Sequence, residues 1–345
     1  MHILVVDDSA VVRQSFSMML SANFSVETAA DPLIAERKIT KQRPDVVVLD
    51  LQMPRMDGLS FLRQIMRRDP LPVVICSSAA ARGSDTAMRA LEEGAVDVIL
   101  KPAAGVREFI AEQSVMIIDT LRAASQARLL RSRASSAGML PVSPAPRRVD
   151  SPRIIAIGAS TGGTEALRVI IEQLPKNAPP VLVVQHMPEG FTAAFAKRLD
   201  SLSQVEVKEA VDGDVIRAGR VLIAPGNHHL AVRRMGSDYR AAVHGGPLIS
   251  RHRPSVDVLF RSMAQAAGNN GIGVILTGMG DDGAAGLAEM RSAGATTIAQ
   301  NEATSVIFGM PKEAIACGAV QSILPLQHIA PALLSHAGIR QGAFQ

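Results

Sequence analysis

The sequence has little cysteine and few aromatic residues. Cys76 and Cys317 are its two cysteines, and neither has another cysteine or a histidine at metal-ligand spacing, which argues against a disulfide framework and a zinc site. Tryptophan is absent and tyrosine occurs once, so few rings are available to stack on nucleic-acid bases. Apolar runs stay below about 18 residues, the length that spans a membrane. We therefore expect a cytoplasmic protein that neither inserts into a membrane nor binds nucleic acid.

The formal net charge of +4 is concentrated in one segment. Residues 125–152 contain five arginines and one acidic residue, together with serines and prolines and few large apolar residues. Proline disfavours helix, and this composition is typical of a flexible linker rather than of a basic folded face. Because 345 residues exceed the usual size of one domain, we predict a domain at 1–124, a linker at 125–152 and a second domain at 153–345.

Apolar, strand-like runs alternate with amphipathic, helix-like stretches on both sides of the linker. Before the linker the runs cover His2–Val6, Asp45–Leu49, Pro72–Cys76 and Val96–Leu100. After it they cover Arg153–Ile157, Val181–Gln185, Val221–Ala224, Ile272–Thr277 and Thr296–Gln300. This alternation predicts parallel sheets covered by helices on both faces. The fold class is therefore α/β, with two doubly wound parallel-sheet domains and no fixed-period repeat.

Polar residues follow the strand-like runs of the first half. Asp7 and Asp8 follow the first run, Asp50 closes the second, Ser77 follows the third and Lys101 the fourth. Because the carboxyl ends of parallel strands lie at one edge of a sheet, these side chains should converge. Three carboxylates repel one another unless a hard cation joins them, and Mg²⁺ fits because it binds carboxylates, waters and phosphate oxygens. Any one of them alone could be structural, for example as a helix cap, but together they predict a phosphoryl site.

The second half opens with a strand-like run that ends in a glycine-rich turn. Residues 158–162 match G-x-S-x-G, with Ser160 at its centre, and a helical pattern follows. A strand, a tight turn and a helix start would expose the Ser160 hydroxyl and aim backbone N–H groups at a developing oxyanion. A dinucleotide-binding loop is the alternative, but that fingerprint requires glycine where Ser160 stands. The pattern favours a serine nucleophile.

A serine nucleophile needs a base, and His186 is the histidine that directly follows a buried-strand pattern. The other histidines could be surface or core residues. An acid that orients His186 could come from Asp281 or Asp282, which follow the run at 272–277, and the pattern by itself leaves both open. The chain order serine, histidine, aspartate differs from the order in α/β-hydrolases, which argues against that fold.

The first half closely resembles the response-regulator receiver domain, a flavodoxin-like fold. The resemblance rests on VVDDS, VVVLDLQMPRMDG, VICSS and ILKP, and it covers residues 1 to about 122. It implies that Asp50 accepts a phosphoryl group from a histidine kinase. It also implies that Asp7, Asp8 and Asp50, with the backbone carbonyl of Gln52, hold Mg²⁺.

Two further receiver positions are implied to read the phosphorylated state, namely Ser77 and Lys101. One position departs from the pattern. Receivers often carry an aromatic switch residue three positions before the lysine, whereas this chain has Val98. Rotation of an aromatic ring therefore cannot be the output signal of this domain.

The second half looks like the chemotaxis protein-glutamate methylesterase family, with a Rossmann-like serine hydrolase domain. The motifs are GASTGGTEAL, VVQHMP, IAPGNHHL, HRPSVDVLF, LTGMGDDGAAGL and AQNEATSVIFGMP, spread over residues 153 to about 320. The resemblance implies that Ser160 is the nucleophile, His186 the general base and Asp282 the acid that orients it. Backbone N–H groups of Thr161 and Met279 are the implied oxyanion donors.

The implied activity is hydrolysis of glutamate methyl esters on chemoreceptors, with release of methanol, and deamidation of receptor glutamines. No cofactor is implied in the esterase site. The resemblance also implies that the receiver restrains the esterase until Asp50 is phosphorylated. Two alternatives are a response regulator with a non-catalytic binding domain and a transcription regulator. No helix-turn-helix pattern follows residue 153, which argues against the latter.

Overall fold

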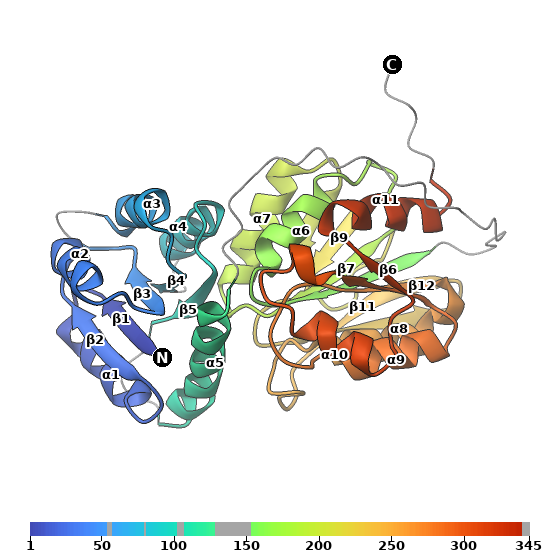
Figure 1. The fold of residues 1–345 in the computed structure, drawn as a ribbon. Helices are drawn as coiled ribbons and strands as arrows, with labels where there is room; N and C mark the ends of the chain where they lie inside the picture. The colour runs from blue at the N-terminus through green and yellow to red at the C-terminus, as the bar shows by residue number, and fades with distance from the viewer. Residues whose placement is uncertain (54–56, 79–80, 102–106, 128–152, 340–345) are drawn as a thin grey trace, which may run out of the picture. The chain divides into compact units, whose positions relative to one another are not determined.

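The structure is a computed structural model that describes residues 1–53, 57–78, 81–101, 107–127 and 153–339 (Figure 1). The chain divides into two compact units, Met1–Leu129 and Leu130–Gln345. The division falls within the predicted linker at 125–152, most of which lies outside the described residues. Among the helices of the described residues, none combines the length and the apolar character that crossing a membrane demands.

The N-terminal unit is built on five parallel strands in the order β2-β1-β3-β4-β5. In Figure 1, α1 and α5 cover one face of this sheet, and α2, α3 and α4 cover the other. Its elements are β1 (His2–Val6), α1 (Ala10–Leu20), β2 (Ser25–Ala29), α2 (Pro32–Lys41), β3 (Val46–Asp50), α3 (Gly58–Arg68), β4 (Val73–Ser77), α4 (Ala81–Glu92), β5 (Asp97–Leu100) and α5 (Arg107–Ser125).

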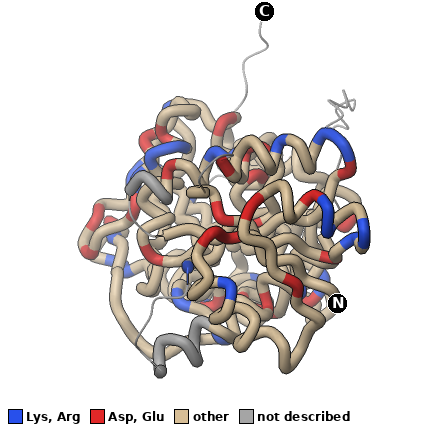
Figure 2. Tube along the Cα trace, turned by 90° about the vertical axis from the view of Figure 1, so that its left-hand side faces the viewer, with Lys and Arg blue, Asp and Glu red and all other residues tan. Residues whose placement is uncertain are grey.

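Local sequence explains where the elements of this unit begin. Carboxylate caps start two helices, because Asp31 accepts from the backbone N–H of Ile34 at 2.9 Å and Asp57 from that of Ser60 at 2.8 Å. The central strands β3 and β4 are fully buried, which accounts for their continuous apolar runs. In Figure 2, acidic and basic segments are interspersed along the described chain.

The C-terminal unit contains a seven-stranded parallel sheet and a two-stranded hairpin. The strand order is β14-β13-β12-β6-β7-β9-β8, and β10 pairs antiparallel with β11. Its elements are β6 (Ile154–Ala159), α6 (Gly163–Ile171), β7 (Val181–Gln185), α7 (Phe191–Leu202), β8 (Glu206–Glu209), β9 (Arg220–Ile223), β10 (His229–Met235), β11 (Asp238–His244), α8 (Val256–Ala266), η1 (Gly268–Asn270), β12 (Gly271–Ile275), α9 (Ala284–Ser292), β13 (Thr296–Gln300), η2 (Glu302–Thr304), α10 (Met310–Ala316), β14 (Ser322–Leu324) and α11 (Leu326–His336).

The predicted fold class of two doubly wound parallel-sheet α/β domains is confirmed, but the sequence prediction missed several strands. Three of them lie at sheet edges: β2, β8 and β14. Edge strands are partly exposed and carry polar residues, so they lack a continuous apolar run. The β10–β11 hairpin was also missed, and it turns at Gly236, whose φ of 64° suits glycine.

Helix α8 packs closely against the central strand β6. A Cβ atom at Gly158 in β6 would lie 2.2 Å from Cγ1 of Val256, the first residue of α8. The same helix supplies Leu259, Phe260 and Met263 to the main core cluster of this unit. A glycine at position 158 therefore allows the start of α8 to reach the carboxyl edge of the sheet.

Gly158→Ala tests this close approach. The added methyl group would overlap a branched side chain at a helix start that is anchored by its core residues, so α8 has to shift. We expect a loss of about 1–3 kcal/mol in the free energy of unfolding. Urea denaturation of the full chain, followed by circular dichroism, measures it. Gly245→Ala is the matched control, because nothing lies within 4 Å of a Cβ atom there; equal midpoints for the two variants would contradict the argument.

Candidate active site

Three neighbouring strands of the C-terminal unit bring Ser160, His186 and Asp282 to one edge of the sheet. Ser160 directly follows β6, His186 directly follows β7, and Asp282 lies in the loop after β12, which pairs with β6 on its other side. Backbone hydrogen bonds tie these loops together. The N–H of His186 donates to the carbonyl of Ala159 at 3.1 Å, and the N–H of Ser160 donates to the carbonyl of Thr277 at 3.0 Å.

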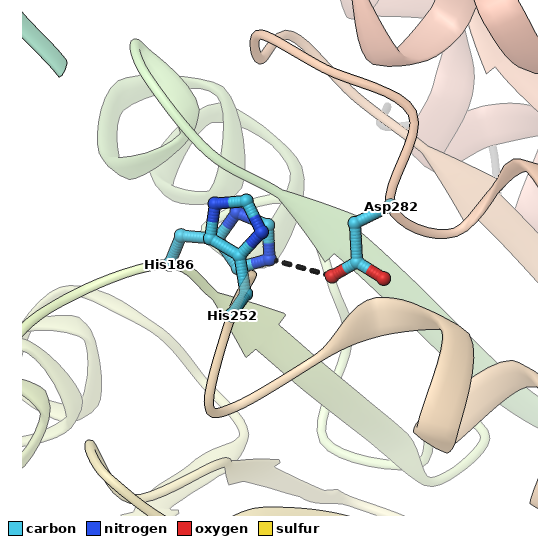
Figure 3. A group of neighbouring side chains, drawn as sticks. All are labelled: His186, His252 and Asp282. Carbon is cyan, nitrogen blue, oxygen red and sulfur yellow. Dashed lines mark hydrogen bonds and ion pairs between the residues drawn. The ribbon is translucent and has the colours of Figure 1, made fainter. Parts of the chain in front are cut away.

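His186 and Asp282 form a buried hydrogen-bonded pair. The distance between His186 Nε2 and Asp282 Oδ2 is 2.8 Å (Figure 3). Asp282 also accepts hydrogen bonds from the start of α8 and from the residue before it. The Ser255 hydroxyl donates to Oδ1 at 2.8 Å, the Val256 N–H to Oδ2 at 2.7 Å and the Asp257 N–H to Oδ1 at 3.0 Å. Both carboxylate oxygens are thus satisfied without water.

These donors keep Asp282 ionised. Burial by itself would raise the pKa of the Asp282 carboxyl, but the hydrogen bond and charge of His186, with the backbone N–H groups of Asp257 and Val256, outweigh burial and lower it. The helix N-terminus contributes favourable partial charge as well. Asp281, the neighbour that the sequence pattern could not distinguish, has an exposed side chain. The structure therefore brings Asp282 to His186.

Ser160 lies at the same edge and is 9% exposed. Its carbonyl accepts from the N–H of Gly163 at 2.7 Å and from Gln185 Nε2 at 2.9 Å, and Gln185 also donates to the carbonyl of His186 at 3.2 Å. Among the described residues, His186 Nδ1 is buried without a hydrogen-bond partner. The expected chain of hydrogen bonds is complete between His186 and Asp282 and open between Ser160 and His186.

The implied oxyanion donors lie in loops that adjoin Ser160. A Cβ atom at Gly278 would lie 2.6 Å from that of Ser160, so the chain passes the serine closely just before Met279. The Thr277 hydroxyl donates to the carbonyl of Thr161 at 3.0 Å and joins the two loops. Within the part of the chain that the structure describes, the N–H of Met279 has no hydrogen-bond partner. This donor remains available to a ligand.

His252, to which the sequence pattern assigns no role, contacts the site. Its ring stacks on His186, with ring centroids 3.7 Å apart and planes 5° apart (Figure 3). Burial, followed by the charge of His186, lowers the pKa of His252 to about 3. The HRPSVDVLF motif contains this residue, but a histidine outside a strand end gave no signal of its role. Ser255 was missed for the same reason. Gln185 was recognised as the end of a strand, but nothing in its pattern indicated that its side chain binds the carbonyl of Ser160.

His186, His252 and Asp282 lie close enough to be compared with a metal site. Two observations argue against that use. The rings of the two histidines are nearly parallel, so their in-plane lone pairs do not converge on one point. The carboxylate oxygens of Asp282 already accept four hydrogen bonds. The arrangement suits proton transfer better than metal binding.

The N-terminal unit has a second cluster, at the carboxyl edge of its sheet. Asp7 and Asp50 are buried, and Lys101 Nζ lies 2.7 Å from Asp50 Oδ2 and 3.1 Å from Asp7 Oδ2. The carboxylates of Asp7, Asp8 and Asp50 lie within 4.8 Å of one another. Ser77 ends β4, and its carbonyl accepts from the N–H of Lys101 at 3.0 Å. The predicted residues of this half are therefore brought together.

The electrostatics of this cluster favour a cation. Burial raises the pKa of Asp50 although Lys101 opposes it, so the carboxylate gains from added positive charge. Burial acts to lower the pKa of Lys101, but the hydrogen bond and charge of Asp50 and Asp7 outweigh it and raise the pKa. Oxygen donors of this kind fit Mg²⁺. Gln52, whose N–H donates to Asp50 Oδ1 at 3.0 Å, places its backbone beside the cluster.

Fold and site together define a receiver domain followed by a hydrolase domain. The family model "Response regulator receiver domain" matches residues 3–111, and "CheB methylesterase" matches residues 155–333. The chain therefore belongs to the CheB family of protein-glutamate methylesterases. These matches give no support to the alternative of a non-catalytic output domain.

Relatives of known name cover nearly the whole chain. One from Rhodospirillum rubrum, named protein-glutamate methylesterase/protein-glutamine glutaminase 2, is 54% identical over 96% of this chain and 97% of its own length. One from Anaeromyxobacter dehalogenans, numbered 1 under the same name, is 56% identical over 97% and 99%. The crystal structure of the Thermotoga maritima CheB methylesterase catalytic domain is 43% identical, with a TM-score of 0.52, over 53% of this chain and 98% of that one.

The stability of the protein should depend on pH through His252. Its folded pKa of about 3 lies below the value of about 6.5 expected in the unfolded chain. Between these values the unfolded chain binds a proton that the folded site does not, so each unit of acidification lowers the free energy of unfolding by about 1.4 kcal/mol. Urea denaturation of wild type and His252→Phe at several pH values measures this term. The variant should lose this part of the slope, and identical slopes would contradict the assignment.

Proposed function

We propose that this chain hydrolyses glutamate methyl esters on chemoreceptors, releasing methanol, and deamidates receptor glutamines, under control of phosphorylation at Asp50. The activity is that of its family, and near relatives carry it in their names. The observation that carries the residue assignment is the buried His186–Asp282 pair on the strand edge that bears Ser160. Since the substrate side chains belong to the cytoplasmic helices of receptors, the enzyme acts in the cytoplasm.

The two ring nitrogens of His186 have different roles in the proposed base: one binds Asp282 and the other accepts the proton. The Nε2–H group donates a hydrogen bond to the Asp282 carboxylate, which fixes the tautomer and leaves the lone pair on Nδ1. The Ser160 hydroxyl transfers its proton to Nδ1 as its oxygen bonds to the ester carbonyl carbon. Methanol then leaves with that proton, and an acyl-enzyme remains. Nδ1 then takes a proton from a water whose oxygen bonds to the acyl carbon. The bond to Ser160 Oγ breaks, Nδ1 returns that proton to Oγ, and the glutamate side chain leaves as a carboxylate.

Stabilisation of the developing oxyanion is assigned to the backbone. The Met279 N–H, without a partner among the described residues, and the Thr161 N–H in the adjoining loop are the proposed donors. Loss of one donor of this kind costs about 10²–10³ in rate. Deamidation uses the same steps with ammonia as the leaving group, because the carbonyl and its oxyanion are alike in the two substrates.

Control by phosphorylation is assigned to the acidic cluster of the N-terminal unit. Asp7, Asp8 and Asp50, with the backbone carbonyl of Gln52, would hold Mg²⁺, which neutralises charge on the phosphoryl oxygens when bound. Asp50 accepts the phosphoryl group from a chemotaxis histidine kinase. Lys101, now paired with Asp50, would exchange that carboxylate partner for a phosphoryl oxygen, and Ser77, at the end of β4, would donate its hydroxyl to the same group.

Ser160→Ala should lower methanol release from methylated receptors by at least about 10³-fold, because no other hydroxyl is assigned to attack the ester. Methanol release by the full chain is the measurement. Phosphorylation of Asp50 by acetyl phosphate should be unchanged in the variant. Ser201→Ala, at an exposed serine of α7, is the matched control. Substantial methanol release by Ser160→Ala would remove Ser160 from the mechanism.

Asp50→Asn should abolish stimulation by a small phosphodonor and leave the unstimulated rate close to that of wild type. The amide keeps the volume of the side chain but cannot accept a phosphoryl group. A tenfold stimulation in wild type corresponds to about 1.4 kcal/mol of differential stability. Methanol release with and without acetyl phosphate measures it, and a chelator should remove stimulation in wild type. Asp69→Asn, at an exposed position, serves as control. Persistent stimulation of Asp50→Asn would require another acceptor.

A further inference from the structure

The ring of His252 stacks on His186, the proposed base. The proposed mechanism gives His252 itself no role. Its stacking contact with His186 is nearly parallel, at 3.7 Å between centroids (Figure 3). The ring of His186 is otherwise held by one hydrogen bond, from Nε2 to Asp282. A single hydrogen bond leaves the imidazole free to tilt about that bond, whereas a flat contact on its face fixes the plane of the ring.

The turn that carries His252 is strained. Ser250 and Arg251 have φ angles of 49° and 67°, in the left-handed region that glycine and asparagine adopt more readily than other residues. Ile249 and His252 exchange both of their backbone hydrogen bonds, at 3.1 and 2.8 Å, which closes the turn. Backbone strain of this kind persists where the surrounding structure requires it, often at functional sites. Here it places the His252 ring on His186.

His252 is also held in one uncharged form. Its Nδ1 donates to the carbonyl of Ser250 at 2.7 Å, since a carbonyl can only accept. The charged and titratable groups that face it are His186 from the end of β7, Asp282 from the loop after β12, and Arg251 from its own turn. A neutral ring beside His186 adds no repulsion when His186 takes up a proton.

We propose that His252 is a positioning residue for His186. Its ring, held by the 249–252 turn, fixes the plane of the His186 imidazole so that Nδ1 stays available to the Ser160 hydroxyl. It also offers an uncharged aromatic face to the imidazolium that forms when His186 accepts the Ser160 proton, a favourable cation–π arrangement. This role rests on the proposed function of His186 as base, and it involves no proton transfer through His252.

A pair of variants separates the ring face from the volume of the side chain. His252→Phe keeps a flat ring that cannot titrate, and His252→Leu fills similar space without one. We expect His252→Leu to lower kcat for methanol release by about 10–100-fold with little change in KM, because a misplaced base slows the chemical step. His252→Phe should stay within about threefold of wild type. His336→Leu, at an exposed histidine of α11, is the matched control.

The pH profile separates a ring that only positions His186 from a ring that takes up a proton itself. If His252 stays neutral, the acid limb of kcat/KM should show loss of activity with one proton in both wild type and His252→Phe. A two-proton limb in wild type that becomes a one-proton limb in His252→Phe would overturn the proposal. This comparison holds even if the leucine variant fails to fold, which a thermal melt of each variant reveals.

The outcomes divide cleanly between the two proposals. Equal kcat values for wild type and His252→Leu would overturn the stacking role alone. A kcat for His252→Phe as low as that of His252→Leu would show that a ring nitrogen of His252 is needed, which also overturns it. Failure of the proposed function would be recognised by a different result: methanol release would persist in Ser160→Ala, whatever residue stands at position 252.

Discussion

The carboxylate of Asp282 is the group on which the geometry of the C-terminal site depends. A charge buried this deeply is stable only when donors surround it, and here they come from His186, from the hydroxyl of Ser255 and from two backbone N–H groups at the start of α8. Meeting that requirement draws the β7 loop and a helix start toward one point. Gly158 in β6 permits the start of α8 to come this close, because a residue without a Cβ atom leaves room for the side chain of Val256. The base is thus oriented by the same contacts that stabilise the buried charge.

Both units use one structural device for different chemistry. In each, parallel strands deliver polar side chains to the carboxyl edge of the sheet, where buried backbone gives way to loops. In the N-terminal unit the edge gathers carboxylates around Lys101, an arrangement whose raised Asp50 pKa favours added positive charge. In the C-terminal unit the edge gathers a hydroxyl, an imidazole and one carboxylate, an arrangement suited to moving a proton. The chemistry follows from which side chains stand at the strand ends.

The buried strands were readily predicted from the sequence, and the edge strands were not. The run VVVLD in β3 is buried at every position, so its apolar pattern is unbroken. By contrast, β8 has the sequence EVKE, with one buried residue, and its polar composition does not distinguish it from a loop. The hairpin of β10 and β11 escaped notice because a single glycine between mixed residues is a weak turn signal. Exposure, which a lone sequence does not reveal, decided which strands could be recognised.

The sequence by itself determined which residue types stand at the strand ends, and so it predicted Ser160, His186 and the acidic cluster around Asp50. The strand-end pattern left Asp281 and Asp282 open, and the family resemblance pointed to Asp282. The tertiary structure decided that Asp282 reaches His186 while Asp281 faces solvent, and that, among the described residues, Nδ1 of His186 is left without a partner. It also decided that His252, from a distant turn, covers the ring of His186. The reason is physical: periodicity records what each segment buries, whereas contacts between loops depend on how several chain reversals place side chains in space.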